Sequence, residues 1–204
     1  MFIFSRQRNG SRNEAGKLKI GILALQGAVE PHCRVLLSLG ATPLLIKTPE
    51  HLKGIQGIIL PGGESTTMLH LLDKNQLFQP LQRFVLEYPS WGICAGAILL
   101  AKRVTSPDQR SLAVFDITLQ RNGFGRQKDS FISVLGSSDD TINGTEAVFI
   151  RAPRIKEMGS GVKTIAQWQN EPVMVEQNHL LCTTFHPELS SSTRIHEYFL
   201  RKIQ

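Results

Sequence analysis

Short apolar runs alternate with helical patterns along the first half of this chain, and this alternation constrains its fold more than any other feature. The predicted strands cover residues 18–25, 44–46 and 58–60, and the predicted helices cover residues 29–39 and 77–86. Strands that alternate with helices join into parallel βαβ units, because each helix crosses one face of the sheet before the next strand begins. The pattern therefore predicts an α/β protein with a mostly parallel sheet flanked by helices.

The pattern changes to strands beyond residue 110. Predicted strands cover residues 116–120, 130–134, 147–150 and 173–185, the last with a turn at Gln177-Asn178. The chain ends in an amphipathic helical pattern over residues 191–203. We therefore expect a β-rich region added to the parallel sheet.

Composition separates the start of the chain from the rest. Residues 1–17 carry four basic side chains and one acid, a net charge of +3, which is half of the +6 of all 204 residues. Low hydrophobicity with excess charge is typical of disorder, so we expect a disordered basic leader over residues 1–16 and one folded domain over residues 17–204. The remaining charge forms no dense Lys/Arg stripe, and nucleic-acid binding is not expected.

The cysteines and apolar runs indicate a cytoplasmic protein. The count is odd and includes no C-x-x-C pair, which argues against a disulfide framework and a zinc site; the three are Cys33, Cys94 and Cys182. No apolar run reaches the roughly 18 residues of a membrane span. The leader also lacks the apolar segment of a secretory signal.

One of these cysteines lies in a pattern that favours catalysis. Residues 92–96 read Gly-Ile-Cys-Ala-Gly between a short apolar strand and a helix, which is the nucleophile elbow with cysteine in the serine position. Glycines permit a sharp strand-to-helix turn, and the helix N-terminus lowers the pKa of a thiol and offers N–H groups to an oxyanion. A buried structural cysteine is the alternative for Cys94.

A base for the thiol follows late in the chain. In the sequence His186-Pro187-Glu188, an extended backbone would point both charged side chains to the same side, so Glu188 can orient His186. The preceding apolar run would place them at the end of a strand, where α/β proteins carry their chemistry. The other five histidines are interpreted as surface residues: His32, His51, His70, His179 and His196.

A glycine-rich loop, Pro-Gly-Gly-Glu-Ser-Thr-Thr at residues 61–67, follows the third predicted strand. It lacks the Gly-Lys-Ser/Thr ending of a phosphate-binding loop. Adjacent glycines can turn a backbone N–H toward a developing oxyanion. The alternative is a plain strand-to-helix turn capped by Ser65 or Thr66.

Together these motifs resemble the class I glutamine amidotransferases, which use a Cys-His-Glu triad. Five stretches resemble more narrowly the branch that provides the glutaminase subunits of pyridoxal 5′-phosphate synthases: LALQGA at 23–28, PGGESTT at 61–67, RNGFGRQ at 121–127, FIRAP at 149–153 and FHPEL at 185–189. The resemblance runs from about Lys19 to the end of the chain. It implies a three-layer, flavodoxin-like α/β fold and a glutaminase domain over residues 17–204.

The resemblance also implies a role for each matching residue. Cys94 would attack the glutamine carboxamide, His186 would carry the proton and Glu188 would orient His186. Backbone N–H groups of Ala95 and of Gly62 or Gly63 would form the oxyanion hole. Glutamine would contact a set in which Arg121 or Arg151 meets the α-carboxylate and Glu64 meets the α-ammonium; the set is Gly63, Glu64, Ser65, Arg121, Ile150 and Arg151.

The implied reaction needs no cofactor and no metal, since thiolate, imidazole and oxyanion hole suffice for acyl transfer. The implied partner is the (β/α)8-barrel subunit of the synthase, which would receive the ammonia and activate this chain. The sequence departs from the branch in its basic leader, in Ile132, where an acid is usual, and in residues 112–116. Two other classes stay open, a different amide hydrolase on the same elbow and a non-catalytic binding module.

Overall fold

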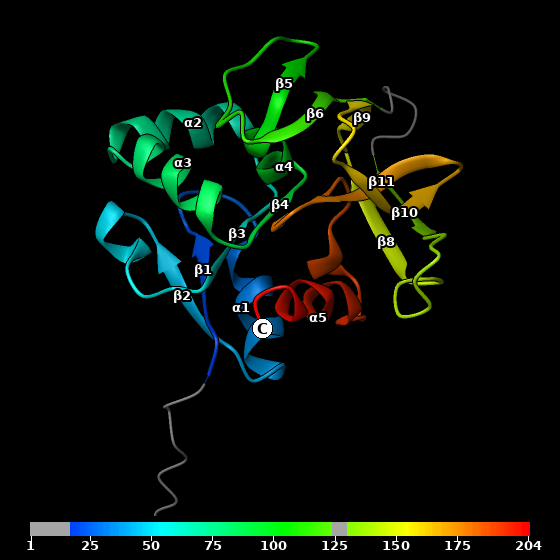
Figure 1. Ribbon diagram of the computed structural model, residues 1–204, viewed down its shortest axis with the longest axis horizontal. Helices are drawn as coiled ribbons and strands as arrows, with labels where there is room; N and C mark the ends of the chain where they lie inside the picture. Colours follow the sequence, from blue (N-terminus) through cyan, green and yellow to red (C-terminus); the bar gives the residue numbers. More distant parts are fainter. Residues whose placement is uncertain (1–16, 124–129) are drawn as a thin grey trace, which may run out of the picture.

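The computed structural model describes residues 17–123 and 130–204, so the predicted leader over residues 1–16 lies outside the described residues. Its centre is a seven-stranded sheet (Figure 1). In spatial order the strands are β10 (Lys163–Trp168), β11 (Glu171–Gln177), β12 (Leu180–Thr183), β4 (Ser90–Ile93), β3 (Gly57–Leu60), β1 (Lys19–Leu23) and β2 (Thr42–Ile46). The five strands from β12 to β2 are parallel, and β10 and β11 extend the sheet in antiparallel fashion.

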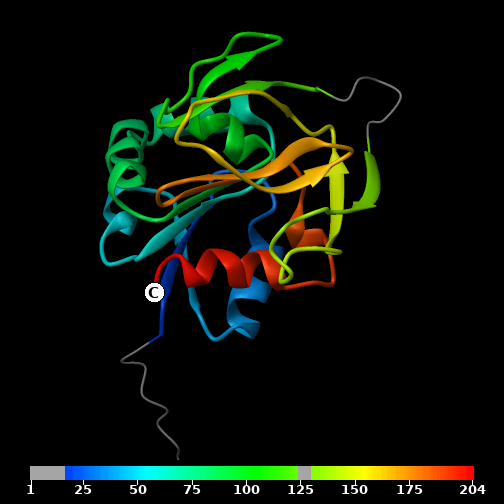
Figure 2. The same ribbon diagram turned by 45° about the vertical axis from the view of Figure 1, so that its right-hand side comes forward.

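Helices cover both faces of this sheet, as Figures 1 and 2 show. One face carries α1 (Val29–Ser38) and α5 (Arg194–Arg201), and the other carries α2 (Ser65–Lys74), α3 (Phe78–Glu87) and α4 (Ala95–Leu100). Short 3-10 turns lie at Pro49–Leu52 (η1) and Pro187–Leu189 (η3). The two apolar cores, one on each face, bury the strands between them and account for the α/β architecture predicted from the alternating pattern.

Two small sheets form the β-rich region that was expected beyond residue 110. One consists of β5 (Ala101–Thr105), β6 (Phe115–Gln120) and β9 (Arg154–Met158), and the other of β7 (Ser130–Val134) and β8 (Glu146–Ile150). The apolar pattern predicted β6, β7 and β8 but not β5, β9 or β10. Charged residues on the exposed sides of the missed strands, such as Lys102 and Glu157, interrupt the apolar pattern.

Several predicted boundaries were wrong. The first strand ends at Leu23 instead of residue 25, and the last helix spans Arg194–Arg201 instead of 191–203. The turn predicted within residues 173–185 is confirmed, since the chain reverses at Asn178, whose φ is 53°, between β11 and β12; only the outer bounds of the run differ. The helix α2 was not among the predicted helices. It begins at Ser65, so the glycine-rich loop directly connects the end of β3 to the first turn of α2.

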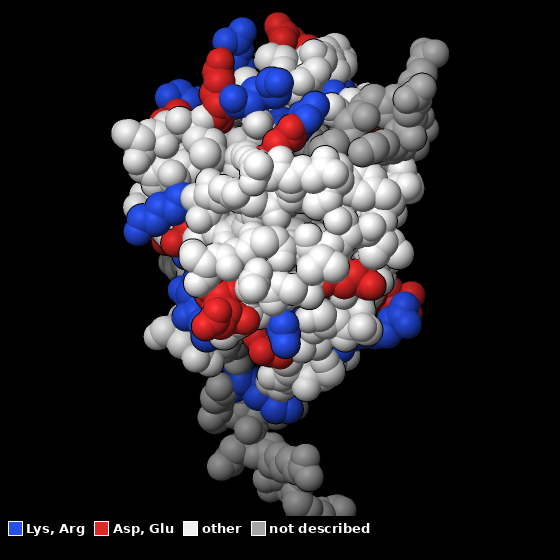
Figure 3. All heavy atoms as spheres, turned by 90° about the vertical axis from the view of Figure 1, so that its right-hand side faces the viewer, with Lys and Arg blue, Asp and Glu red and all other residues white. Residues whose placement is uncertain are grey.

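The surface carries mixed charge. On the face shown in Figure 3, lysines and arginines lie among acidic side chains around a broad uncharged area. Within residues 17–123 and 130–204, no helix has the length and apolar character needed to cross a membrane.

Candidate active site

Cys94 occupies the turn between β4 and α4. Its φ of 48° and ψ of −100° lie in a region that L-residues seldom adopt, as predicted for the nucleophile elbow. The Cys94 N–H donates to the Thr183 carbonyl of the neighbouring strand at 2.9 Å, and the Sγ lies 3.9 Å from the Ile150 carbonyl oxygen. The strained turn is therefore held from both β12 and β8, and the thiol is only 7% exposed.

The glycine at the far side of the elbow is required by close packing. A Cβ added at Gly96 would overlap the carbonyl oxygen of Leu60 on the adjacent strand β3. Backbone cannot move aside as a flexible side chain can, so α4 can sit this close to the sheet only with glycine at this position. The first N–H of α4, at Ala95, has no carbonyl of its own helix to bond, and Ala95 lines the cavity together with Cys94.

His186 and Glu188 are in contact, but not through the extended backbone that the sequence predicted. The strand β12 ends at Thr183, and Glu188 lies in the 3-10 turn η3, which begins directly after His186. This turn brings Glu188 Oε1 within 2.8 Å of His186 Nδ1. The predicted pairing is present, and the predicted conformation was wrong, because Pro187 starts a helical turn instead of continuing the strand.

The pair sits in a dry environment that still favours a protonated imidazole. Burial acts to lower the pKa of His186, but its interactions with Cys94 and Glu188 outweigh burial and raise the pKa to about 10. The backbone N–H of His186 donates to the Val148 carbonyl on β8 at 2.7 Å. This bond fixes the backbone position from which the imidazole extends. Glu188 can thus stabilise a protonated His186, whose imidazole lines the same cavity as the Cys94 thiol.

The loop after β3 packs against the same histidine. A Cβ at Gly62 would overlap Cε1 of the His186 ring. The loop can therefore lie this close to the imidazole only with glycine at position 62. The Gly62 carbonyl accepts a hydrogen bond from the Ala28 N–H at 3.1 Å, and Gly63 lines the cavity that contains the thiol. Of the candidate oxyanion donors, Gly63 and Ala95 border the cavity, whereas Gly62 lies against the ring of His186.

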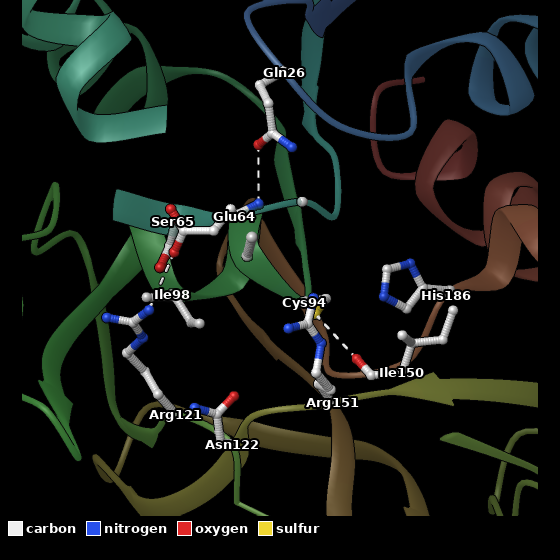
Figure 4. Close-up of a pocket in the computed structure, with 12 residues that line it drawn as sticks. Gln26, Glu64, Ser65, Cys94, Ile98, Arg121, Asn122, Ile150, Arg151 and His186 are labelled. Carbon is white, nitrogen blue, oxygen red and sulfur yellow. Dashed lines mark hydrogen bonds and ion pairs between the residues drawn. The ribbon is translucent and has the colours of Figure 1, made fainter. Parts of the chain in front are cut away.

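A cavity of about 350 Å³ opens in front of the thiol (Figure 4). All six predicted glutamine contacts line it, together with Cys94, Ala95 and His186. Sequence analysis assigned no role to three further lining residues: Gln26, Ile98 and Asn122. Gln26 and Asn122 belong to the LALQGA and RNGFGRQ stretches, so those motifs were the available signal, whereas Ile98 is one apolar helix residue among several.

Glu64 caps the helix α2. Its carboxylate accepts hydrogen bonds from the backbone N–H groups of Thr66 at 3.2 Å and Thr67 at 2.7 Å. The alternative interpretation of this loop, a turn capped by Ser65 or Thr66, named the wrong capping residue, because the Glu64 side chain is long enough to fold back over the first turn. Partial burial acts to raise the pKa of Glu64, but the hydrogen bonds from Thr66 and Thr67 dominate and lower it to about 2.

Two arginines approach the cavity from the β-rich region. Arg121 follows β6 and pairs with Glu64, with Nη2 3.2 Å from Oε1. Arg151 follows β8 and extends into the cavity in Figure 4, and no ion pair involves it within the described ranges. In the protein without ligand, Glu64 and Arg121 therefore neutralise each other, while Arg151 offers an uncompensated positive charge.

Two of the five histidines assigned to the surface are instead completely buried. His32 on α1 and His196 on α5 have no exposed area. Their rings contact each other, with His32 Nδ1 2.9 Å from His196 Nε2. The prediction failed because the buried side of each amphipathic helix was inferred from its apolar residues alone. Each histidine lies on that buried side, among the apolar residues.

Comparisons with known proteins agree with this geometry. Two curated relatives named pyridoxal 5′-phosphate synthase subunit PdxT are 48% identical over 192 residues, from Dictyoglomus turgidum, and 45% identical over 191 residues, from Geobacillus kaustophilus. The first alignment covers 91% of this chain and 98% of the relative, and the second 92% and 95%.

Solved structures show the same likeness. A crystal structure of a glutamine amidotransferase is 38% identical with a TM-score of 0.85, covering 90% of this chain and 98% of that one. The PurLQS structure from Thermotoga maritima, at 12% identity and a TM-score of 0.65, covers 92% and 99% and shares the fold alone. The model of the SNO glutamine amidotransferase family matches residues 22–204. With its predicted three-layer fold and its nucleophile elbow in place, this chain belongs to the SNO glutamine amidotransferase family.

Proposed function

We propose that this chain hydrolyses L-glutamine to L-glutamate and ammonia, with Cys94 as nucleophile. The observation that supports it most is the buried pair in which Glu188 Oε1 contacts His186 Nδ1 at 2.8 Å, with His186 and Cys94 lining the same cavity. A serine or cysteine hydrolase needs this order of nucleophile, base and orienting acid. The non-catalytic alternative offers no reason to keep a carboxylate buried behind a histidine.

The chemistry follows from the positions of these groups. The Cys94 thiolate attacks the side-chain amide carbon of glutamine, and the carbonyl oxygen becomes an oxyanion that N–H groups of Ala95 and Gly63 can meet. His186 then protonates the amide nitrogen, so that ammonia leaves and a thioester remains. Water attacks the thioester while His186 accepts its proton, and glutamate departs as the thiolate is restored.

The cavity favours a free amino acid over a peptide. Its volume of about 350 Å³ suits a ligand of glutamine's size, and Figure 4 shows Glu64 and Arg121 on the side of the cavity opposite His186, with Arg151 reaching toward Cys94. The uncompensated Arg151 is suited to the α-carboxylate, with Arg121 as a second cation. Glu64 would meet the α-ammonium in exchange for one of its present donors, because its carboxylate has about four acceptor sites and already accepts from Thr66, Thr67 and Arg121.

The ammonia is supplied to a synthase. The curated relatives are named as subunits of pyridoxal 5′-phosphate synthase, and we propose the same assignment for this chain, with a (β/α)8-barrel subunit as its partner. Full activity requires that partner, which sets the loop at Gly62 and Gly63 for oxyanion binding. The product cofactor belongs to the pathway and is not bound by this chain.

Ammonia release from glutamine, with and without the candidate barrel subunit, tests the proposal. The wild-type complex should release ammonia, and Cys94→Ala should abolish release while the variant keeps its fold and its binding to the partner. Cys182→Ala is the matched control, since Cys182 is buried in strand β12 away from the cavity lining. Ammonia released by Cys94→Ala would refute the nucleophile, and cleavage of peptides but not of free glutamine would favour the other hydrolase class.

A further inference from the structure

A chain of buried polar groups continues from Glu188 away from the cavity. Glu188 Oε1 is used by His186, and the other carboxylate oxygen, Oε2, lies 3.6 Å from His32 Nε2. His32 Nδ1 lies 2.9 Å from His196 Nε2. The side chains of Glu188 and His32 are both 0% exposed. The line therefore runs from the cavity to the layer formed by α1 and α5 (Figure 1).

Packing alone does not account for two imidazoles in this place. Trp91 contacts both rings edge-on, with centroid distances of 6.0 Å to His32 and 5.0 Å to His196, and the Phe199 ring lies tilted against Trp91. Apolar side chains would fill such surroundings at lower cost, because an imidazole loses its hydrogen bonds to water on burial. The two histidines recover part of this loss through each other, and His32 Nε2 faces Glu188, while His196 Nδ1 is a buried atom without a hydrogen-bond partner among the described residues.

The hydrogen bonds that buried atoms lack also point to a pairing of His32 with Glu188. Within the described ranges, His32 Nε2 and Glu188 Oε2 are both buried atoms that lack a hydrogen-bond partner, and they face each other. Their separation of 3.6 Å exceeds a hydrogen bond by about half an ångström. Active-site hydrogen bonds commonly tighten when substrate binds, so a small shift completes this one.

The protonation states select one arrangement of protons. Burial, with smaller contributions from His196 and His186, lowers the pKa of His32 well below its usual value, and burial lowers that of His196 to about 4. Both rings are therefore neutral near pH 7, with one donor and one acceptor nitrogen each. A proton on His32 Nε2 faces the carboxylate, whereas a proton on Nδ1 would set the Nε2 lone pair against those of Glu188. His32 then accepts from the Nε2–H of His196.

We infer that His32, oriented by His196, is a positioning residue that holds the second oxygen of Glu188. With Oε2 fixed, the carboxylate cannot rotate, and Oε1 stays aligned with His186 Nδ1. The orientation of the catalytic groups thereby depends on His32 in α1 and on His196 in α5. This inference rests on the proposed glutaminase function.

Substitutions at His32 test the role. His32→Leu removes the donor and keeps similar volume, whereas His32→Gln places an amide N–H close to the position of Nε2. In the complex with the barrel subunit, His32→Leu should lower kcat roughly ten- to hundredfold, the usual loss when a residue that supports an active-site group is removed, with KM for glutamine little changed. His32→Gln should restore most of kcat. The exposed His70→Leu is the matched control.

A second experiment separates positioning from packing. If His32 acts through Glu188, His32→Leu should cost little further activity in a Glu188→Gln background, because coupled residues are not additive. Thermal unfolding of every variant shows whether the fold is kept. Equal loss of kcat in His32→Leu and His32→Gln, or full additivity with Glu188→Gln, would overturn the inference.

A third measurement does not depend on glutamine. The rate at which iodoacetamide alkylates Cys94, followed by peptide mapping in a Cys33→Ser background, reports the thiolate–imidazolium pair directly. His32→Leu should slow alkylation and shift its pH profile, and His32→Gln should reverse both. A wild-type complex that releases no ammonia while alkylation still depends on His32 would refute the proposed function and support the positioning role. Unchanged alkylation and kcat in His32→Leu would refute the positioning role alone.

Discussion

The two walls of the cavity differ in how their polar groups are held. The triad wall consists of Cys94, His186 and Glu188, and its acid and base side chains are 0% and 9% exposed. The binding wall consists of Glu64, Arg121 and Arg151, and there the Glu64 side chain is 44% exposed and Arg121 16%. The groups proposed to react are dry and fixed by backbone hydrogen bonds. The groups proposed to bind substrate are more exposed than the acid and base, and two of them, Glu64 and Arg121, are paired with each other.

This difference indicates which kinetic constant each wall controls. Hydrogen bonds in a dry site are strong and poorly replaced by water, so damage to the triad wall should appear in kcat. Charges at the more exposed binding wall contribute mainly to holding the substrate, so damage there should appear in KM. Substitutions that each remove one group from one wall test whether the triad wall controls kcat and the binding wall controls KM.

The largest effect after loss of the nucleophile is expected for Glu188→Gln. The amide cannot carry the charge that stabilises protonated His186, and it can present a donor to Nδ1, so kcat should fall by roughly 10³-fold with KM little changed. Steady-state ammonia release in the complex measures both constants. The exposed Glu87→Gln should behave as wild type. A near-normal kcat for Glu188→Gln would leave Glu188 a structural role only.

A smaller effect, in the other constant, is expected for Arg121→Met. The substitution keeps an apolar stem but removes a guanidinium that lines the cavity, and a hydrogen bond to a charged group contributes about 1.5–3 kcal/mol. KM for glutamine should therefore rise roughly ten- to hundredfold, while kcat falls less. Arg103→Met, at an exposed position of β5, is the matched control. If Arg121→Met lowers kcat with KM unchanged, the division between the walls is wrong.

The triad wall was also the more predictable of the two. The elbow at Cys94 and the pair His186 and Glu188 follow local rules, since strand ends, glycine positions and the chemistry of a thiol base constrain them. The sequence could not show that Glu188 lies in a 3-10 turn, because the conformation of a short segment after a strand depends on what packs around it. The six binding residues came from the resemblance, and all of them line the cavity.

The long-range contacts were beyond sequence reasoning. His32 and His196 are 164 positions apart, and only the packing of α1 beside α5 brings their rings together. The ion pair between Glu64 and Arg121 likewise joins a loop of the parallel sheet to the added β-rich region. Periodicity predicts which face of an element is buried, but not which buried side chain of another element it meets.

The smallest effect is expected for Glu64→Gln, and it concerns stability and its dependence on pH. Glu64 caps α2, and replacement of its charge should lower the free energy of unfolding by about 1 kcal/mol at pH 7, a value reduced by solvent screening at this half-exposed side chain. The pKa of Glu64 is lowered to about 2 in the folded protein, against 4.5 as its ordinary value. The stabilisation is therefore complete above pH 4.5 and is lost as pH falls toward 2. Urea unfolding between pH 7 and 3 should show wild type and Glu64→Gln converging below about pH 4.5, with Glu87→Gln as control. A difference that stays constant down to pH 3 would mean that the carboxylate's charge does not stabilise α2, and that the binding wall is held by Arg121 alone.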